Sequence, residues 1–410
     1  MNKLSMTPFL QFTIALVIII AAAKMGGYLS LKLGQPSVLG ELAVGILLGP
    51  SVFDMIHWAP FTDKHLGEAI AHIAELGVLM LMFIAGLDLH LSDLAKSGKA
   101  SILAGIFGIF IPLGMGYGVA RAFSFDVQQA LFTGLILSAT SVSISAQTLM
   151  ELKVLRSRVG IGLLGAAVFD DILVVLGLSI FIALAVGSGG LEGILWIIMR
   201  MILYLGAAAV LGIALLPRLS QKIDRLPISQ GLLAFVVVVT LFYAWSAEIL
   251  GGMAAITGSF LAGLMFARSP LKERIESGIS SLAYSVFVPI FFVNVGLAAN
   301  ARLLTGDSLW LLLGMSLVAI VSKVLGAGLG ARMAGFSNLE ALQLGAGMSS
   351  RGEVGLIVAS VGIAEGMISS DIFAVVVGVV IITTLLTPMM LRSLFARDRA
   401  AKEVQLLEMD

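Results

Sequence analysis

Two adjacent carboxylates, Asp170 and Asp171, stand near the middle of an apolar run that extends from about residue 159 to residue 186. A run of that length can cross a lipid bilayer as a helix. An ionisable group at the centre of a membrane costs at least about 2.5–3.5 kcal/mol, so such groups are rare and usually functional. We therefore interpret the two aspartates as the site around which the chain is organised.

Carboxylates in this setting can hold a cation and a proton in turn. Burial favours the protonated form of a carboxylate, and a nearby cation favours the charged form. Hard carboxylate oxygens also suit alkali cations. Neighbouring residues on a helix point about 100° apart, so both side chains can face a packed interior but cannot face each other. We predict a cation and proton site at Asp170 and Asp171; a buried polar pair that only fixes helix packing is the structural alternative.

A third ionisable group, Lys323, lies deep in a later apolar run that covers residues 307–333. It is too far from either end of that run to reach the membrane surface easily. Charges inside membranes pair with one another, so we expect Lys323 to bind one of the aspartates. In the sharper hypothesis Lys323 holds Asp170, Asp171 binds the cation, and proton uptake by this pair breaks the bridge. A simple structural ion pair is the alternative.

The apolar run 127–150 is interrupted at mid-depth by a polar stretch that includes Thr140, Ser141 and Ser143. Such a sequence favours local unwinding of a helix. Non-helical backbone survives at membrane depth only where protein or a water-filled cavity covers it. Beside the aspartates, these residues could offer hydroxyl or carbonyl oxygens to a cation. Hydrogen bonds to their own backbone are the alternative.

A second run, 339–364, is interrupted by four glycines, two serines and the charged residues Arg351 and Glu353. Glycine at these positions weakens the helix. Arg351 and Glu353 flank Gly352, where they could compensate the dipoles of two half-helices. We favour this supporting role over direct contact with an ion.

Three more charges lie in apolar runs. Glu41 and Glu75 could serve the site or line its approach, and we treat both as candidates for an ion pathway. Arg200 is a charge for which the sequence offers no explanation.

The composition indicates an all-α, polytopic membrane protein. Of the 410 residues, 59% are hydrophobic and 12% are charged, whereas soluble proteins have about 25% charged residues.

Cysteine is absent, which excludes disulfides, thiolate metal sites and a cysteine nucleophile. We find no Walker motif and no dinucleotide fingerprint after a predicted strand. We therefore expect no cofactor, no nucleic-acid partner and no ATP-driven step, and we expect the first apolar run to be a retained span.

Hydropathy predicts thirteen transmembrane spans. Loops that follow odd-numbered spans, together with the C-terminal tail, hold 17 of the 25 lysines and arginines, and the other side holds 4. By the positive-inside rule the N-terminus lies outside and the C-terminus in the cytoplasm of a cell (inner) membrane. The predicted spans are 8–33, 36–52, 68–88, 98–123, 127–150, 159–187, 191–216, 229–247, 251–267, 283–298, 307–333, 339–364 and 370–394.

The two interrupted runs are the middle members of two groups of three spans, 98–187 and 307–394. The first group begins in the cytoplasm and the second begins outside, so the groups have inverted topology. Inverted repeats that each contain a discontinuous helix are typical of secondary transporters, with the site near the membrane midplane where the breaks meet.

Seven motifs together resemble the monovalent cation:proton antiporter-2 family, and most closely its NapA-type sodium/proton antiporters. The resemblance covers nearly the whole chain. The motifs that carry it are SVLGELAVGILLGP at 37–50, FIAGLD at 83–88, ATSVS at 139–143, FDD at 169–171, PIFFVNVG at 289–296, SKVLG at 322–326 and RGE at 351–353.

The resemblance implies a homodimer whose protomers each have a dimerisation domain and a moving core with two crossing discontinuous helices, the NhaA/NapA-like antiporter fold. Asp171 matches the ion-binding aspartate, Asp170 its partner, and Lys323 the lysine that bridges to Asp170. The double aspartate is associated with electrogenic exchange of two protons for one sodium ion. The implied parts are 1–97 and 218–304 (dimerisation domain), 98–188 and 305–395 (core transport domain), 189–217 (linker span) and 396–410 (cytoplasmic tail).

These observations favour a secondary antiporter that exports cytoplasmic Na⁺ or Li⁺ in exchange for protons, with Na⁺ at Asp171 and Asp170. A potassium/proton antiporter or potassium efflux protein of the same family is the first alternative. The related glutathione-gated efflux proteins carry Gln-Asp at the position of Asp170 and Asp171, together with a cytoplasmic nucleotide-binding domain. This sequence shows neither feature, which argues against that branch. An ion channel would need a filter-like repeat, which we do not find. An intramembrane aspartyl protease needs carboxylates that face each other from separate helices, which adjacent residues cannot provide.

Overall fold

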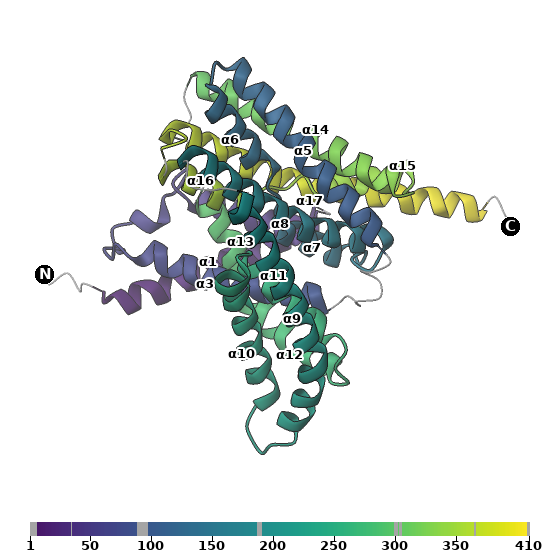
Figure 1. Cartoon of the computed structure of the whole chain (residues 1–410). Coiled ribbons are helices and arrows are strands. Elements are labelled where there is room, and N and C mark those ends of the chain that lie inside the picture. The colour runs from purple at the N-terminus through teal and green to yellow at the C-terminus, as the bar shows by residue number, and fades with distance from the viewer. Residues whose placement is uncertain are drawn as a thin grey trace, which may run out of the picture.

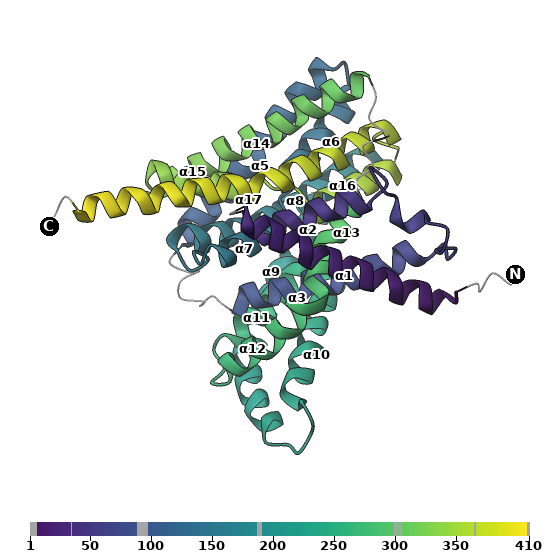
Figure 2. The same cartoon turned by 180° about the vertical axis from the view of Figure 1, so that it is seen from behind.

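A computed structural model describes residues 6–33, 35–87, 97–186, 191–298, 302, 306–364 and 366–407, and leaves out some side chains within the helices. In these residues the chain is helical, with turns and no strand, which confirms the predicted fold class. The purple start of α1 and the yellow end of α17 lie on opposite sides of the molecule in both views (Figures 1 and 2).

Each predicted span coincides with one helix or with a pair of consecutive helices. The helices are α1 (Pro8–Lys32), α2 (Ser37–Leu48), η1 (Met55–His57), α3 (Leu66–Leu87), α5 (Gly98–Ala122), α6 (Val127–Ser138), α7 (Val142–Glu151), α8 (Arg158–Val186), α9 (Leu191–Asp224), α10 (Gly231–Ser246), η2 (Ala247–Gly251), α11 (Ala255–Phe266), α12 (Lys272–Leu282), η3 (Ala283–Phe287), α13 (Val288–Leu297), α14 (Asp307–Met333), α15 (Asn338–Gly347), α16 (Glu353–Ala364) and α17 (Ser370–Leu407).

Within the described ranges, nine helical segments are long and apolar enough to cross a membrane, and α2 and α11 are shorter apolar helices. The number of crossings therefore stays a prediction. Three helical segments are longer than predicted: α9 continues to Asp224, α17 continues to Leu407, and α12 extends the predicted span 283–298 back to Lys272 without a break. Hydropathy marks where the apolar surface ends, but a helix can continue into water as long as its backbone hydrogen bonds continue.

The two predicted helix breaks are present. Between α6 and α7 the backbone is extended at Ala139 and Ser141, with ψ of 141° and 117°. The second break separates α15 from α16 at residues 348–352. The breaks lie against each other, because a Cβ added to Gly352 would collide with the side chain of Ser141. Only glycine allows the two segments to approach this closely.

The helices pack mainly in two groups, which we name by their content. The broken-helix group comprises α5–α8 and α14–α17, in which α5 packs on α14, α6 and α8. The flanking group comprises α1–α3 and α10–α13, in which α3 packs on α11 and α13. Helix α9 contacts α10 and α11 of the flanking group and α8 of the broken-helix group. In Figure 1 the broken-helix group occupies the upper part of the molecule, and α10 and α12 extend downwards.

Helices α3 and α11 of the flanking group are held together by close backbone contact. A Cβ at Gly86 would collide with the carbonyl oxygen of Phe260, and a Cβ at Gly263 would collide with that of Phe83. Small residues at such crossings let helices in membranes pack through their backbones. Helix α11 therefore has a fixed position on α3.

Where α7 ends and α2 begins, a polar contact joins the two groups. The backbone nitrogen of Ser37 donates to Oε2 of Glu151 at 2.7 Å, and the Ser37 hydroxyl donates to Oε1. A carboxylate at a helix N-terminus is favourable because it binds free N–H groups and opposes the helix dipole. Glu151 of the broken-helix group thus caps a helix of the flanking group.

Candidate functional site

Asp170 on α8 and Lys323 on α14 form a fully buried ion pair. Nζ of Lys323 donates to Oδ1 of Asp170 at 2.7 Å, and both side chains have an exposed fraction of 0%. The two helices come from opposite halves of the chain. An isolated buried charge is very costly, so each partner needs the other in this environment.

The second carboxylate oxygen of Asp170, Oδ2, has fewer hydrogen-bond partners than Oδ1. The Thr140 hydroxyl and the Arg351 guanidinium both interact electrostatically with the Asp170 carboxylate. Oδ2 of Asp170 and the hydroxyl oxygen of Thr140 are nevertheless buried without a well-formed hydrogen bond. Two oxygens with spare coordination capacity therefore lie close to the Lys323 bridge.

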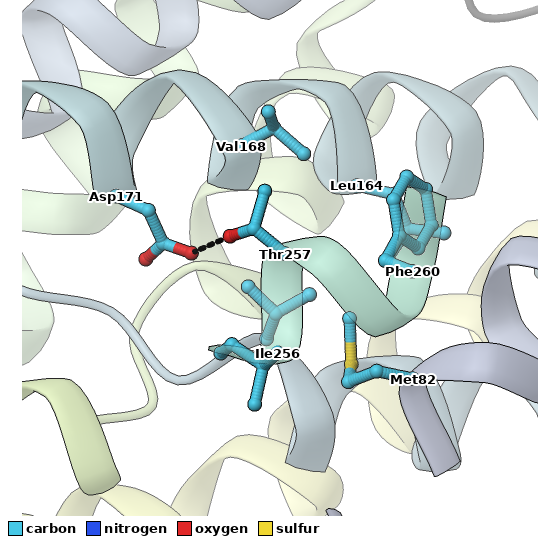
Figure 3. A pocket seen from close by; sticks show the side chains of 8 residues that line it. Met82, Leu164, Val168, Asp171, Ile256, Thr257 and Phe260 are labelled. Carbon is cyan, nitrogen blue, oxygen red and sulfur yellow. Dashed lines mark hydrogen bonds between the residues drawn. The ribbon is translucent and has the colours of Figure 1, made fainter. Parts of the chain in front are cut away.

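Asp171 has a different partner, on a different group of helices. The hydroxyl of Thr257, in the first turn of α11, donates to Oδ2 of Asp171 at 3.2 Å (Figure 3). Both side chains are buried, with exposed fractions of 4% for Asp171 and 3% for Thr257. Asp170 is thus bound within the broken-helix group, whereas Asp171 reaches the flanking group.

A small cavity adjoins Asp171 between the two groups. Its free space of about 10 Å³ is enough for the centre of roughly one water molecule. Apart from Asp171 and Thr257 its lining is apolar and comes from α3, α7, α8 and α11: Met82, Val142, Leu164, Val168, Ile256 and Phe260.

The two helix breaks are joined directly. The backbone nitrogen of Ser141 donates to the carbonyl of Ser350 at 2.9 Å, and the Ser350 hydroxyl donates to the carbonyl of Ser141 at 2.6 Å. The hydroxyls of Ser141 and Ser143 hydrogen-bond each other at 3.1 Å. Ser141 thus connects the two breaks, and Thr140, the residue before it, interacts with the Asp170 carboxylate.

Arg351 lies inside the second break and is almost completely buried. Its guanidinium donates to the carbonyls of Met348 and Ser349, at the end of α15, and to that of Ala319 on α14. A positive charge at this position opposes the negative end of the α15 dipole. The side chain of Glu353, the other residue predicted to support this break, lies outside the described residues.

The two acids suggested for an ion pathway have other neighbours. Glu75 is 73% exposed and lies 3.6 Å from the ring nitrogen of His72 on the same helix. Glu41 is buried on α2, where its electrostatic neighbours are Lys24 and Glu151. The described contacts bring neither acid to the two aspartates.

Sequence reasoning missed Thr257 and left Arg200 unexplained. A single threonine in an apolar run is common in membrane helices, so Thr257 carried no signal. Arg200 on α9 donates to the carbonyls of Ile249 and Leu250, next to Gly252 with its φ of +65°. It therefore satisfies carbonyl groups at the end of η2, which a helix terminus leaves without partners.

Comparison with known proteins gives consistent results. The profile of the family described as "Sodium/hydrogen exchanger, transmembrane" matches residues 15–397. The Na(+)/H(+)-K(+) antiporter GerN of Bacillus cereus is 36% identical over 395 residues, which are 96% of this chain and 98% of GerN. A Na(+)/H(+) antiporter of Enterococcus hirae is 33% identical, over 93% of this chain and 98% of its own length.

A solved structure shares the fold. The sodium proton antiporter MjNhaP1 of Methanocaldococcus jannaschii at pH 8 superposes with a TM-score of 0.67 at 18% identity, over 94% of this chain and 96% of MjNhaP1. The match supports the antiporter fold, and the family suggested by the sequence motifs is confirmed at the level of sodium/hydrogen exchangers. The chain therefore belongs to the transmembrane sodium/hydrogen exchanger family.

Proposed function

We propose that this protein is a secondary antiporter that exports cytoplasmic Na⁺, or Li⁺, in exchange for external protons. The family assignment and the relatives that are named as Na⁺/H⁺ antiporters support the exchange. The observation that carries the mechanism is the buried Lys323–Asp170 pair beside Asp171, at the crossing of the two helix breaks.

In this proposal Asp171 binds the cation, and the Lys323–Asp170 pair couples binding to protons. Na⁺ and H⁺ compete for the same carboxylate oxygens, since a protonated carboxyl group is a poor cation ligand. When Asp170 takes up a proton, its bridge to Lys323 breaks. Thr140, whose hydroxyl oxygen is buried near Asp170, is a further candidate ligand, and the backbone at Ser141 another. Arg351 holds the second break through its contacts with three carbonyls, and Glu353 stays a candidate from the sequence for the same support.

Alternating access would follow from movement of one group of helices against the other. The broken-helix group carries both aspartates and Lys323 and is the candidate for the moving core. The flanking group is the candidate for a stationary, dimer-forming scaffold, with α9 as linker. The few contacts between the groups, of which the Ser37–Glu151 contact is one, support such a division.

The asymmetry of basic residues supports an N-terminus outside the cell and a C-terminus in the cytoplasm. With two protons exchanged for one Na⁺, each cycle moves net charge inwards. A membrane potential of about 100 mV contributes about 2.3 kcal/mol per charge, which can drive Na⁺ export.

Transport in proteoliposomes tests the proposal. Purified protein is reconstituted with a pH-sensitive dye inside the vesicles, and pulses of Na⁺, Li⁺ or K⁺ are added outside. We expect Na⁺-dependent proton flux in the wild type and none in Asp171→Asn. Asp224→Asn is a matched control, because Asp224 pairs with Arg274 on the surface at 2.6 Å.

The opposite results would contradict the proposal. A wild type without Na⁺- or Li⁺-dependent proton flux would refute it, as would full flux in Asp171→Asn. Flux with K⁺ alone would instead favour potassium/proton exchange, for which the Na(+)/H(+)-K(+) antiporter GerN gives a precedent.

A further inference from the structure

Thr257 differs from Thr148 and Thr240, two other buried threonines of the membrane helices, in what its hydroxyl binds. Thr148 on α7 and Thr240 on α10 each donate to the carbonyl four residues earlier, at 2.8 Å. This is the ordinary behaviour of threonine inside a helix. The hydroxyl of Thr257 instead crosses to Asp171 on the opposite group of helices, at 3.2 Å.

The position of Thr257 makes that contact well defined. The residue lies in the first turn of α11, directly after the turn at Gly252. Helix α11 is fixed to α3 by the backbone contacts at Gly86 and Gly263. The hydroxyl is thus presented to Asp171 from a helix that is rigidly placed in the flanking group.

The geometry also suits a shared cation. Two oxygens that each lie about 2.4 Å from one cation, and subtend a right angle at it, are about 3.4 Å apart. Oγ1 of Thr257 and Oδ2 of Asp171 are 3.2 Å apart, close to this separation. The adjoining cavity is small and otherwise apolar, so it offers a cation few other oxygens on that side.

A cation here needs oxygens that do not come from a cluster of acids. In the part of the chain that the structure describes, no three His, Cys, Asp or Glu side chains lie together in a way that could hold a metal ion. A hydroxyl oxygen next to Asp171 would supply part of the missing coordination.

We propose that Thr257 is a ligand of the transported cation, supplied by the flanking group to the carboxylate of Asp171. In this structure the hydroxyl donates to Asp171. When a cation binds, the hydroxyl proton turns away and the same oxygen coordinates the ion. This inference rests on the proposed function, and it adds that the cation joins the two groups of helices in this conformation.

The consequence is a cation affinity that depends on conformation. Movement of the broken-helix group would separate Asp171 from Thr257 and remove one ligand from the ion. The cation would then be bound more weakly and released more readily. Loss of the hydroxyl should therefore change the half-saturating cation concentration more than the maximal rate.

Thr257→Val tests the proposal, because valine keeps the branched shape of threonine and lacks the hydroxyl. We expect the half-saturating Na⁺ concentration for exchange in proteoliposomes to rise about tenfold, equivalent to about 1.4 kcal/mol, with a maximal rate within about twofold of wild type. Thr257→Ser should stay close to wild type. Thr240→Val, at a buried threonine whose hydroxyl donates to the Val236 carbonyl of its own helix, should leave the Na⁺ dependence unchanged.

A second measurement separates binding from folding. Na⁺ should raise the Tm of the purified wild type and of Thr257→Ser, and a higher Na⁺ concentration should be needed for the same increase in Thr257→Val or in the smaller Thr257→Ala. An unchanged Na⁺ dependence of both exchange and Tm in these two variants would overturn the proposal. A wild type without Na⁺-dependent exchange would refute the proposed function instead.

Discussion

Nζ of Lys323 lies 2.7 Å from Oδ1 of Asp170, and no part of either side chain is exposed. The two residues stand 153 positions apart in the sequence, on helices of the two inverted groups. Such a pair resists disruption, because removal of either partner strands a buried charge. Protonation of Asp170 would break this ion pair, because it removes the negative charge that binds Lys323.

We expect Lys323→Gln to reduce the dependence of exchange on the membrane potential. Without the ammonium group, Asp170 is best accommodated as a neutral acid throughout the transport cycle. One proton fewer would then be exchanged for each Na⁺, so less net charge would cross the membrane. Loss of the buried pair should also lower the free energy of unfolding, by about 3 kcal/mol. Exchange rates under imposed potentials and thermal unfolding measure the two effects.

Lys222→Gln is the matched control, because Lys222 is exposed near the end of α9. An unchanged potential dependence in Lys323→Gln would contradict the coupling role of this lysine. A wild type that is insensitive to potential would refute the two-proton assignment and leave antiport intact.

We expect Arg351→Met to destabilise the second helix break. The guanidinium donates to three carbonyl groups, which would remain buried without these donors. The loss should lower the free energy of unfolding by about 3 kcal/mol, because each unsatisfied buried group costs about 1–3 kcal/mol. Unfolding in detergent, followed by tryptophan fluorescence, measures it.

Arg274→Met provides the comparison, since Arg274 forms a surface ion pair with Asp224 and should contribute at most about 1 kcal/mol. Equal destabilisation by the two substitutions would contradict the prediction that the buried hydrogen bonds of Arg351 stabilise the second helix break.

We expect Gly352→Ala to impair the crossing of the two breaks. A Cβ at this position would lie 2.5 Å from Oγ and 2.6 Å from Cβ of Ser141. Overpacking of this kind typically costs about 1–3 kcal/mol, and the displaced Ser141 should also slow exchange. Ser141→Gly in the same chain should relieve the collision and restore part of the stability.

Gly118→Ala on α5 is the control, because a Cβ there meets nothing within 4 Å. Alanine is a better helix former than glycine, so this change should be neutral or slightly stabilising. A Gly352→Ala protein with wild-type stability and exchange would contradict the packing described for the crossing.

The sequence predicts those features that a single physical constraint decides. A lysine buried in the membrane requires an acidic partner, because an unpaired buried charge is too costly. The structure shows that Asp170 is the partner of Lys323. The breaks were predictable because glycine, serine and threonine weaken a helix at known positions. Hydropathy could not place the ends of α9 and α17, where charged residues continue the helix beyond the apolar part.

Features that depend on the direction of a side chain were not predictable. Glu75 stands in an apolar helix, yet its side chain is 73% exposed beside His72. Thr257 looks like any threonine of a membrane helix, and its hydrogen bond to Asp171 depends on where the packing of α11 on α3 places the first turn of α11. Arg200 acquires its partners from a helix end about 50 residues later.

Proton release on Na⁺ binding tests the central claim most directly, because the claim is that one set of carboxylate oxygens serves both ions. Purified wild-type protein in weakly buffered detergent solution, at a pH where the site is partly protonated, is mixed with Na⁺ and the pH is recorded. We predict a saturable release of protons from the wild type and from Asp224→Asn, and none from Asp171→Asn. Saturable Na⁺ binding to the wild type with no proton release at any pH would contradict the account.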